Sequence, residues 1–492
     1  MRMTNAGWRR MRWLGIASAM SVSLVLIVVA ALASAARSIP PGPTNLSQSQ
    51  FMSFFADVAV SPDGEQVVVV WPEAHTVGTL PPFGSVRLRW ISESDGEWRA
   101  PATVFAGSPE ACAEWASVDV STGTAHLAYL VSRPCSNVQG GADTQTIYYQ
   151  TYDLPTGEAG FSHTVTTTQV LIRGFEQVDI ALDASGTAHF AYIYSDGAGA
   201  TGELTGTIYY RDFGAGVFGP EMRLSETANA RDPVIACADE RVHVIWSVLE
   251  EREEERWRWQ IAHRRRDGGA WGTVDSPIKF SDDYNPRHPA IAARGDDVLV
   301  SWSWESEEDQ YMLAYSRYTQ SWPSRIYEVG TTDSAPIPLN HGDAGLRTPT
   351  YTYRSGTEIW ADYDFALRPS VALDRDGLPV VVWQAYQGDS KGLVHYSRAL
   401  SKTQVVIGDQ VDHVFIWSEP AVFNRYTQRN SLVPKLAMAP VVSPSLHVVY
   451  LREMSDNNWD TYYEGESEQQ GDKPNAVFLP LVMRGCAAGG DD

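Results

Sequence analysis

The chain of 492 residues contains only four cysteines, and no two of them form a C-x-x-C pair. This absence argues against a cysteine zinc site. The sequence also lacks a phosphate-binding P-loop and an H-E-x-x-H zinc motif. We therefore expect neither a metal nor a cofactor.

Basic residues are also scarce, since 38 Lys and Arg stand against 60 Asp and Glu, for a net charge of -22. The first 36 residues hold four arginines and no acid, so the rest of the chain carries -22 minus 4, or -26. Such an acidic surface repels phosphate backbones and anionic membrane surfaces. We expect no nucleic-acid partner.

One long apolar run, residues 14–33, follows four arginines and ends in the small residues Ala33-Ser34-Ala35. This order predicts a signal peptide over residues 1–36, cleaved after Ala35 or Ala36. About 20 apolar residues can also cross a bilayer, so an uncleaved tether through residues 14–33 is the alternative. Either reading predicts a secreted or cell-surface protein. A Pro/Ser/Gln-rich linker, residues 37–50, comes next.

A repeated motif organises the rest of the chain. Its fullest copy, residues 229–246, joins an R-x-P entry, a short apolar strand, a tight turn and a second strand that ends in Trp. A Tyr-rich third strand and a fourth strand beginning with an aromatic follow in most copies. Seven copies end their second strand at Trp71, Tyr129, Tyr192, Trp246, Trp302, Trp383 and Tyr450. The pattern predicts an all-β fold, a monomeric seven-bladed β-propeller of four-stranded antiparallel blades over residues 51–470.

The spacing of these aromatic markers reveals one insertion. Trp302 and Trp383 are 81 residues apart, whereas the other intervals are 54 to 67 residues. We place an insertion at residues 331–365, between the fifth and sixth blades. Residues 471–492 hold an apolar segment that could close the last blade or serve surface sorting, and then a Gly-rich tail. At eight residues the apolar segment is too short to span a membrane.

The repeats resemble the sialidase-like, BNR-type propellers of secreted bacterial proteins. The resemblance covers residues 52 to about 465 and rests on the P-x-I-A, H-V-x-W and I-x-Y-x-R strands and the G-x-W turn. No copy of the S-x-D-x-G-x-x-W box of sialidases is complete. Active sialidases clamp a carboxylate with three arginines, the first in an R-I-P motif. The resemblance therefore implies the fold, and no catalytic residue is carried over.

Three arginines are candidate ligand-binding residues. Arg231 and Arg287 belong to R-x-P motifs, and Arg368-Pro369 is a shortened form, so we expect all three at one rim of the central channel. Such a cluster could hold a carboxylate or sulfate by bidentate hydrogen bonds. The alternative is a ring of ion pairs with Asp232 or neighbouring acidic loops.

Four further residues are candidates for the same face. His288 does not repeat among the blades, so it could be a base or a metal ligand, or simply a surface histidine. Trp257, Trp259 and Trp360 could stack on sugar rings or serve local packing. By contrast, we expect structural roles for the histidines that repeat three positions before the marker: His126, His189, His243 and His447.

Cys112 and Cys135 fall in one repeat, and after export they are compatible with a disulfide.

For function, we expect an extracellular propeller that binds a glycan or a protein partner on its loop-rich face. The alternatives are a sialidase-like glycoside hydrolase, or another enzyme that degrades acidic polysaccharides, and a purely structural surface module. The missing catalytic motifs favour binding over catalysis.

Overall fold

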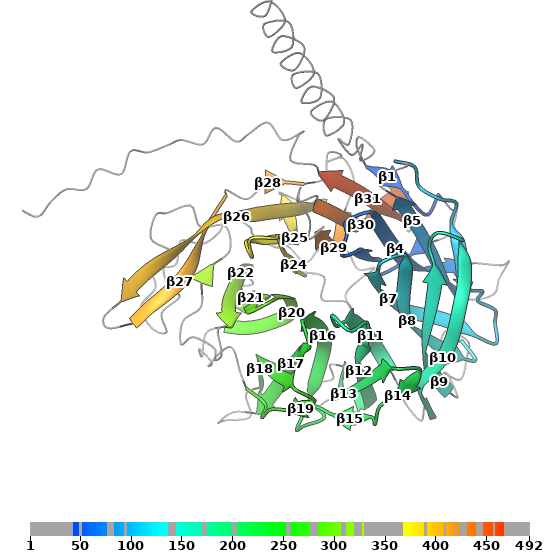
Figure 1. Ribbon diagram of the computed structural model, residues 1–492, viewed down its shortest axis with the longest axis horizontal. Helices are drawn as coiled ribbons and strands as arrows, with labels where there is room; N and C mark the ends of the chain where they lie inside the picture. Colours follow the sequence, from blue (N-terminus) through cyan, green and yellow to red (C-terminus); the bar gives the residue numbers. More distant parts are fainter. Residues whose placement is uncertain are drawn as a thin grey trace, which may run out of the picture.

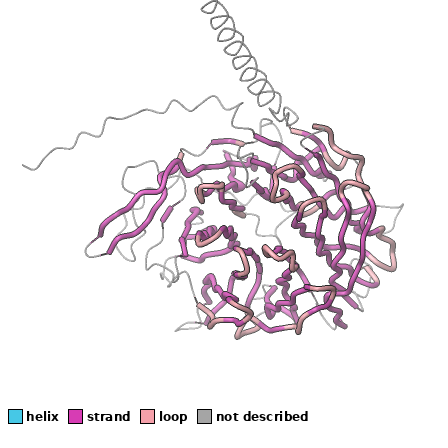
Figure 2. Tube along the Cα trace, viewed as in Figure 1, coloured by secondary structure: helices cyan, strands magenta, loops and turns pink. Residues whose placement is uncertain are grey.

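The computed structural model describes 18 segments of the chain. They are residues 43–48, 52–75, 83–92, 96–135, 144–169, 175–198, 204–251, 257–275, 284–306, 311–318, 327–328, 368–387, 391–407, 410–418, 421–423, 431–438, 446–455 and 458–466. Nearly all of these residues lie in strands or in the turns between them (Figure 2). No described segment forms a helix that is long and apolar enough to cross a membrane. The signal segment, the 331–365 insertion and residues 471–492 lie outside the described residues.

The described strands form six antiparallel sheets that follow one another around a central axis (Figure 1). The first sheet contains β2 (Met52–Ser53), β3 (Asp57–Val60), β4 (Gln66–His75), β5 (Phe83–Ser92) and β6 (Ala102–Phe105). The second contains β7 (Cys112–Ser121), β8 (Thr124–Arg133), β9 (Thr144–Asp153) and β10 (Glu158–Gln169).

The third sheet is the largest, with nine strands. It contains β11 (Phe175–Leu182), β12 (Ala188–Ala198), β13 (Leu204–Gly214), β14 (Val217–Phe218), β15 (Met222–Arg223), β16 (Ala230–Ala238), β17 (Arg241–Glu251), β18 (Trp257–Asp267) and β19 (Ala270–Trp271). Only one residue pair, Gly206 with Ala230, joins β13 to β16. The sheet thus consists of two units that are paired through the backbone at one residue pair and packed together through side chains such as Ile208 and Trp246.

Three sheets complete the chain. The fourth contains β20 (Tyr284–Arg294), β21 (Asp297–Ser306), β22 (Tyr311–Tyr318) and β23 (Tyr327–Glu328). The fifth contains β24 (Ser370–Leu373), β25 (Pro379–Gln387), β26 (Lys391–Ile407), β27 (Gln410–Trp417) and β28 (Ala421–Val422). The sixth contains β29 (Ser431–Met438), β30 (Leu446–Ser455), β31 (Asn458–Glu466) and β1 (Thr44–Asn45). The β26–β27 hairpin projects beyond the other sheets (Figure 1).

Strand β1 completes the sixth sheet with residues from the other end of the chain. Thr44 pairs with Tyr463, and the N–H of Leu46 donates to the carbonyl of Thr461 at 2.8 Å. Leu46 is fully buried. A segment expected to be a linker therefore joins the first part of the chain to the last. The apolar C-terminal segment, expected either to close the last blade or to serve surface sorting, lies outside the described residues.

The hydrophobic core is divided among the interfaces between neighbouring sheets. One cluster packs Val69 and Trp71 of β4 against Val449 of β30 and Tyr463 of β31. The aromatic markers of the repeat are buried at these interfaces, with Trp71, Tyr192, Trp302 and Tyr450 at 0% exposure. They recur because each sheet needs a large apolar side chain to fill the space beside the next sheet.

The repeated histidines belong to this core. His126, His189 and His447 each place Nδ1 2.7 Å from the hydroxyl of a tyrosine on the third strand of the same sheet. His243 instead meets His263, with 3.1 Å between Nδ1 and Nε2. A buried polar ring needs such a partner, so these histidines have the structural role that their repetition predicted.

Candidate functional site

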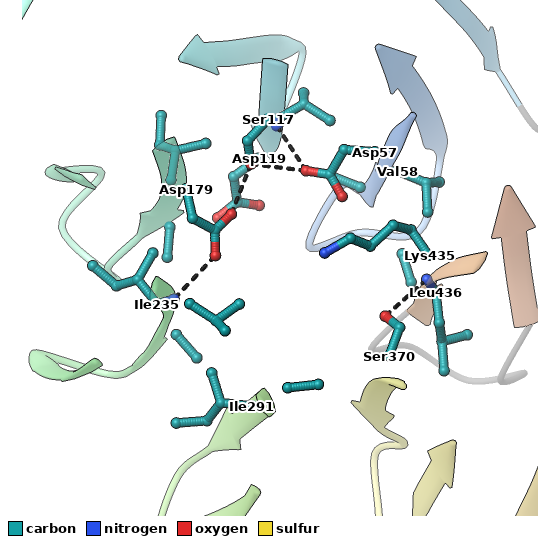
Figure 3. Close-up of a pocket in the computed structure, with 18 of the residues that line it drawn as sticks. Asp57, Val58, Ser117, Asp119, Asp179, Ile235, Ile291, Ser370, Lys435 and Leu436 are labelled. Carbon is teal, nitrogen blue, oxygen red and sulfur yellow. Dashed lines mark hydrogen bonds between the residues drawn. The ribbon is translucent and has the colours of Figure 1, made fainter. Parts of the chain in front are cut away.

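A cavity of about 340 Å³ lies where the innermost strands of the sheets face one another (Figure 3). Its lining residues come from seven segments far apart in the sequence, at or next to strands β3, β7, β11, β16, β20, β24 and β29. The volume falls in the range of small-ligand pockets. The cavity is therefore the candidate site.

Strand register places one residue from each segment at a common level, which we call the middle ring. Each member pairs with the residue that precedes the aromatic marker of the next strand, as Asp57 does with Val70 before Trp71. The members are Asp57, Ser117, Asp179, Val234, Ala290, Ser370 and Lys435. The ring thus carries two acids, two hydroxyls and one cation.

Hydrogen bonds link neighbours in the middle ring. The Ser117 hydroxyl lies 2.8 Å from Oδ2 of Asp57 and 2.8 Å from Oδ1 of Asp179. The backbone N–H of Val118 donates to Asp57 at 3.0 Å, and that of Ile235 donates to Asp179 at 3.0 Å. These bonds hold side chains of one strand against the backbone of the next (Figure 3).

Charge in the middle ring is only partly balanced. Lys435 reaches from β29 into the cavity (Figure 3). Burial raises the pKa of Asp179 to about 6, which the nearby Asp57 reinforces and Lys435 opposes. Burial also raises the pKa of Asp119, two residues beyond Ser117, to about 6 although it accepts N–H groups from Val120 and Leu182. These carboxyls hold protons more readily than ordinary aspartates.

A second level, the upper ring, lies two residues earlier in each segment, nearer the connections between second and third strands. Its members all line the cavity: Phe55, Trp115, Gln177, Asp232, His288, Arg368 and Val433. The rings of Phe55 and Trp115 stack with their centroids 4.6 Å apart. Asp232, His288 and Arg368 come from three consecutive lining segments. The upper ring therefore has an apolar side and a polar side.

Bulges in the strands turn the upper-ring residues toward the cavity. Pairing slips between Arg231 and Val234 in β16 and between Arg287 and Ala290 in β20. The residue before the proline takes a left-handed backbone there, with φ of 51° at Asp232 and 50° at His288. Such conformations are costly for residues other than glycine and often mark functional positions.

Asp232 and His288 form the polar centre of the upper ring. Nδ1 of His288 lies 3.2 Å from Oδ2 of Asp232, and Nε of Arg231 lies 3.1 Å from the same oxygen. Burial would raise the pKa of Asp232, but the charges of Arg231, His288 and Arg368 hold it well below its usual range. Burial lowers the pKa of His288 to about 4. At neutral pH a neutral imidazole thus faces an ionised carboxylate, and Nδ1–H is its donor.

The three candidate arginines take two kinds of position. Arg368 directly precedes its proline, as Asp232 and His288 do, so it shares their level and lines the cavity. Arg231 and Arg287 are not among the lining residues. Their guanidinium carbons lie over the ring of Trp259, 4.6 and 5.7 Å from its centroid. The bulges turn the residue after each of these two arginines toward the cavity. Arg231 still lies next to the lining through its 3.1 Å contact with Asp232, which is the ion pair that the alternative predicted, and the common rim stays a prediction.

The structure also bears on the candidate histidine and tryptophans. His288 is 6% exposed and paired with Asp232, so it is not a surface histidine. Trp259 is 2% exposed beneath the two arginines, which suits packing and leaves no open face for a sugar. Trp360 and the side chain of Trp257 lie outside the described residues.

Sequence reasoning missed the middle ring and both aromatics of the upper ring. The sequence does contain an indication of Asp57 and Asp179, because each is a charged residue in the apolar first strand of its repeat, in the runs D-V-A-V and V-D-I. Charged residues in such buried strands are rare unless they are paired. Phe55 and Trp115 had no comparable signal, since their level depends on where each strand bulges.

Two other chemical features were tested. Cys112 and Cys135 are joined in a disulfide, with their Cα atoms 5.2 Å apart. Among the described residues, no group of three or more His, Cys, Asp or Glu side chains is arranged to hold a metal ion.

Two short glycine patterns match catalytic motifs by letter alone. G-D-S-K-G at residues 388–392 ends in the first residues of β26, which follows β25, and G-A-G-A-T-G at residues 197–202 begins in the last residues of β12, which precedes β13. Both patterns connect paired antiparallel strands. The corresponding motifs require a strand followed by a helix, so neither pattern indicates a nucleophile or a dinucleotide site here.

No protein-family model and no curated protein matches the chain. A protein of unknown function from Dyadobacter fermentans is a similar solved structure, with 8% identity and a TM-score of 0.43 over 86% of this chain and 99% of that one. The sialidase of Trypanosoma rangeli in complex with sialic acid is 8% identical, with a TM-score of 0.39 over 87% and 59%. The NanB sialidase of Streptococcus pneumoniae is 10% identical, with a TM-score of 0.40 over 86% and 70%. Similarity at this level assigns neither an activity nor a site residue to this chain.

Proposed function

We propose that this chain is an exported, seven-bladed β-propeller that binds a saccharide in its central cavity. The lining supports the proposed count of seven blades, since each of the seven lining segments begins one repeat. The nine-stranded sheet counts as two blades because one residue pair joins its halves. Strand β1 makes the outer strand of the seventh blade.

The composition of the upper ring carries the saccharide proposal. Phe55 and Trp115 offer apolar ring surface, while Asp232, His288 and Arg368 offer donors and acceptors. The guanidinium carbon of Arg368 lies 6.0 Å from the centroid of the Phe55 ring, where the two kinds of surface meet. A sugar has the same division, with C–H faces and a rim of hydroxyls. A few oriented polar groups beside aromatic walls are typical of small-ligand sites.

The charges favour a saccharide with hydroxyl or amine groups over a strongly acidic one. Of the three arginines expected to clamp a carboxylate, only Arg368 lines the cavity. Arg368 and Lys435 share the lining with Asp57, Asp119, Asp179 and Asp232. Planar carboxylates accept hydrogen bonds from sugar hydroxyls, so this lining suits a polyhydroxylated ligand.

A glycan array, followed by calorimetry with the best ligand, tests this proposal on the purified chain. Arg368→Gln and Trp115→Leu should each weaken binding at least about tenfold, the effect of losing roughly 1.4 kcal/mol of contact. Arg287→Gln is the matched control, because it removes an arginine of the same motif outside the lining. Absence of any saccharide ligand, or equal losses in all three variants, would refute the proposal.

A second candidate function is glycoside hydrolysis, favoured by the pair Asp57 and Asp179. Both carboxylates approach the Ser117 hydroxyl to 2.8 Å, so these two oxygens are at most twice that distance apart. Retaining glycosidases hold two carboxyl groups about 5 to 5.5 Å apart, one of them with a raised pKa. A panel of fluorogenic glycosides, including a sialoside, tests it. Turnover lost in Asp179→Asn would support hydrolysis, and no turnover on any of them would leave binding alone.

A further inference from the structure

The middle ring contains a hydrogen-bond chain with fewer protons than acceptors. Ser117 is 2% exposed, and its hydroxyl lies 2.8 Å from a carboxylate oxygen on either side. A serine hydroxyl has one proton to donate and can accept bonds through its lone pairs. If both aspartates were ionised, one of these contacts would bring two acceptor oxygens together without a proton. A second proton must therefore lie in the chain.

The backbone decides which carboxyl holds the second proton. Oδ2 of Asp57 already accepts the N–H of Val118 at 3.0 Å, so it is an acceptor. In Asp179 the Ile235 N–H goes to Oδ2, the other oxygen. Among the residues that the structure describes, only Ser117 bonds to Oδ1 of Asp179. The proton therefore belongs on Oδ1 of Asp179.

We propose that Asp179 is a neutral carboxylic acid that donates to Ser117 while Ser117 donates to Asp57, so that the three residues form a proton relay in the cavity wall. Proton transfer breaks the Asp179 O–H bond and forms a new O–H bond on Ser117. The original Ser117 O–H bond breaks as Asp57 gains a proton. One proton thus moves from one side of the ring to the other, and the net charge is unchanged.

The surroundings of Asp179 agree with a neutral acid. Asp57 on β3 and Asp119 on β7 supply negative charge, while Lys435 on β29 supplies one positive charge and Ile235 on β16 an N–H. Burial raises the pKa of Asp179 to about 6, so the neutral acid of the relay is the major form below about pH 6. A ligand that donates to either aspartate competes with Ser117, so cavity occupancy and proton occupancy are linked. This link rests on the proposed binding function, but the relay itself does not.

Titration of the ligand-free protein tests the relay. The chain is labelled with ¹³C at aspartate carboxyls, and the signals are followed by NMR from about pH 4 to 8. Asp179→Asn identifies the Asp179 signal, and Asp119→Asn identifies that of Asp119, which titrates in the same range. Ser117→Ala should lower the pKa of Asp179 by about one pH unit, because the neutral acid loses its acceptor. Ser117→Thr, which keeps the hydroxyl, should restore the wild-type value.

The direction of the shift decides the outcome. If Ser117 donates to Asp179 instead, Ser117→Ala removes a bond to the ionised form and raises the pKa. A raised or unchanged value therefore overturns the relay. Should Ser117→Ala fail to fold, Ser117→Cys replaces it, since a thiol is a weaker acceptor than a hydroxyl and must lower the pKa of Asp179 if Asp179 donates. An unchanged value there also overturns the proposal. Failure of saccharide binding leaves all these results unaffected.

Discussion

Nδ1 of His288 lies 3.2 Å from Oδ2 of Asp232, and the two residues occupy matching left-handed positions in neighbouring strands. The same carboxylate oxygen lies 3.1 Å from Nε of Arg231. The Asp232 carboxylate thus pairs with the cation of Arg231 and accepts from the His288 imidazole, and the positive charge of Arg368 also stabilises it. Asp232 is the residue on which the polar side of the upper ring depends.

Asp232→Asn should destabilise the protein more than other losses of an acid. It leaves buried cationic groups without their counter-charge, so we expect a loss of about 3 kcal/mol in the free energy of unfolding. Asp267→Asn is the control, because Asp267 pairs with Arg265 while 58% exposed and should cost less than about 1 kcal/mol. Urea denaturation of both variants measures the difference. Equal losses would contradict this role for Asp232.

Buried histidines should make the fold sensitive to acid. Burial lowers the pKa of His126, His243 and His288 to about 4, whereas an unfolded histidine titrates near about 6.5. Between about pH 6.5 and 4 the histidines of the unfolded chain bind protons that those of the folded chain do not. The stability from these residues is therefore complete above about pH 6.5 and is lost as the pH falls toward 4.

Three aspartates oppose this trend. Burial raises the pKa values of Asp119, Asp179 and Asp460, so the folded state binds these protons first. The contribution of Asp119 and Asp179 grows as the pH falls from about 6 toward 4. Histidines with lowered pKa values outnumber them: His126, His189, His243, His263, His288 and His395. Urea denaturation at several pH values should show a net loss on acidification, with a shallower slope in His126→Gln. An unchanged slope in that variant would refute the assignment to His126.

The disulfide between Cys112 and Cys135 should stabilise the second sheet. It closes a loop across a sequence separation of 23, which corresponds to about 3 kcal/mol of lost chain entropy in the unfolded state. We expect the Cys112→Ala/Cys135→Ala double variant to lose about that much stability. Cys237→Ala controls for loss of a thiol, since Cys237 is free. Reducing agent should lower the melting temperature of the wild type and leave the double variant unchanged.

Leu46 should contribute strongly to the stability of the whole fold. It is fully buried beside β1, where the N-terminal part of the chain joins the last sheet. Leu46→Ala should cost about 2 to 4 kcal/mol, the usual range for a large-to-small change in a core. Gln48→Asn, at an exposed position two residues away, should have little effect. The denaturation curves of the two variants would coincide if the contact of β1 with the sixth sheet did not stabilise the protein.

Much of the architecture could be read from the chain. The recurring aromatic markers predicted the second strands, and the structure buries them between sheets. The repeated histidines predicted a structural role, and their tyrosine partners supply it. Both inferences depend on local periodicity, because a residue that every sheet needs must return at every repeat.

The cavity could not be read in the same way. Arg368 lines it while Arg231 and Arg287 do not, since bulges of one residue decide which side chain enters. Asp57, Ser117 and Asp179 are about 60 residues apart in sequence and meet only because three sheets stand side by side. Local periodicity is enough to predict the repeats, the strands and the residues that pack them. Which non-repeating residues face one another depends on strand register and bulges, and packing between distant segments sets both.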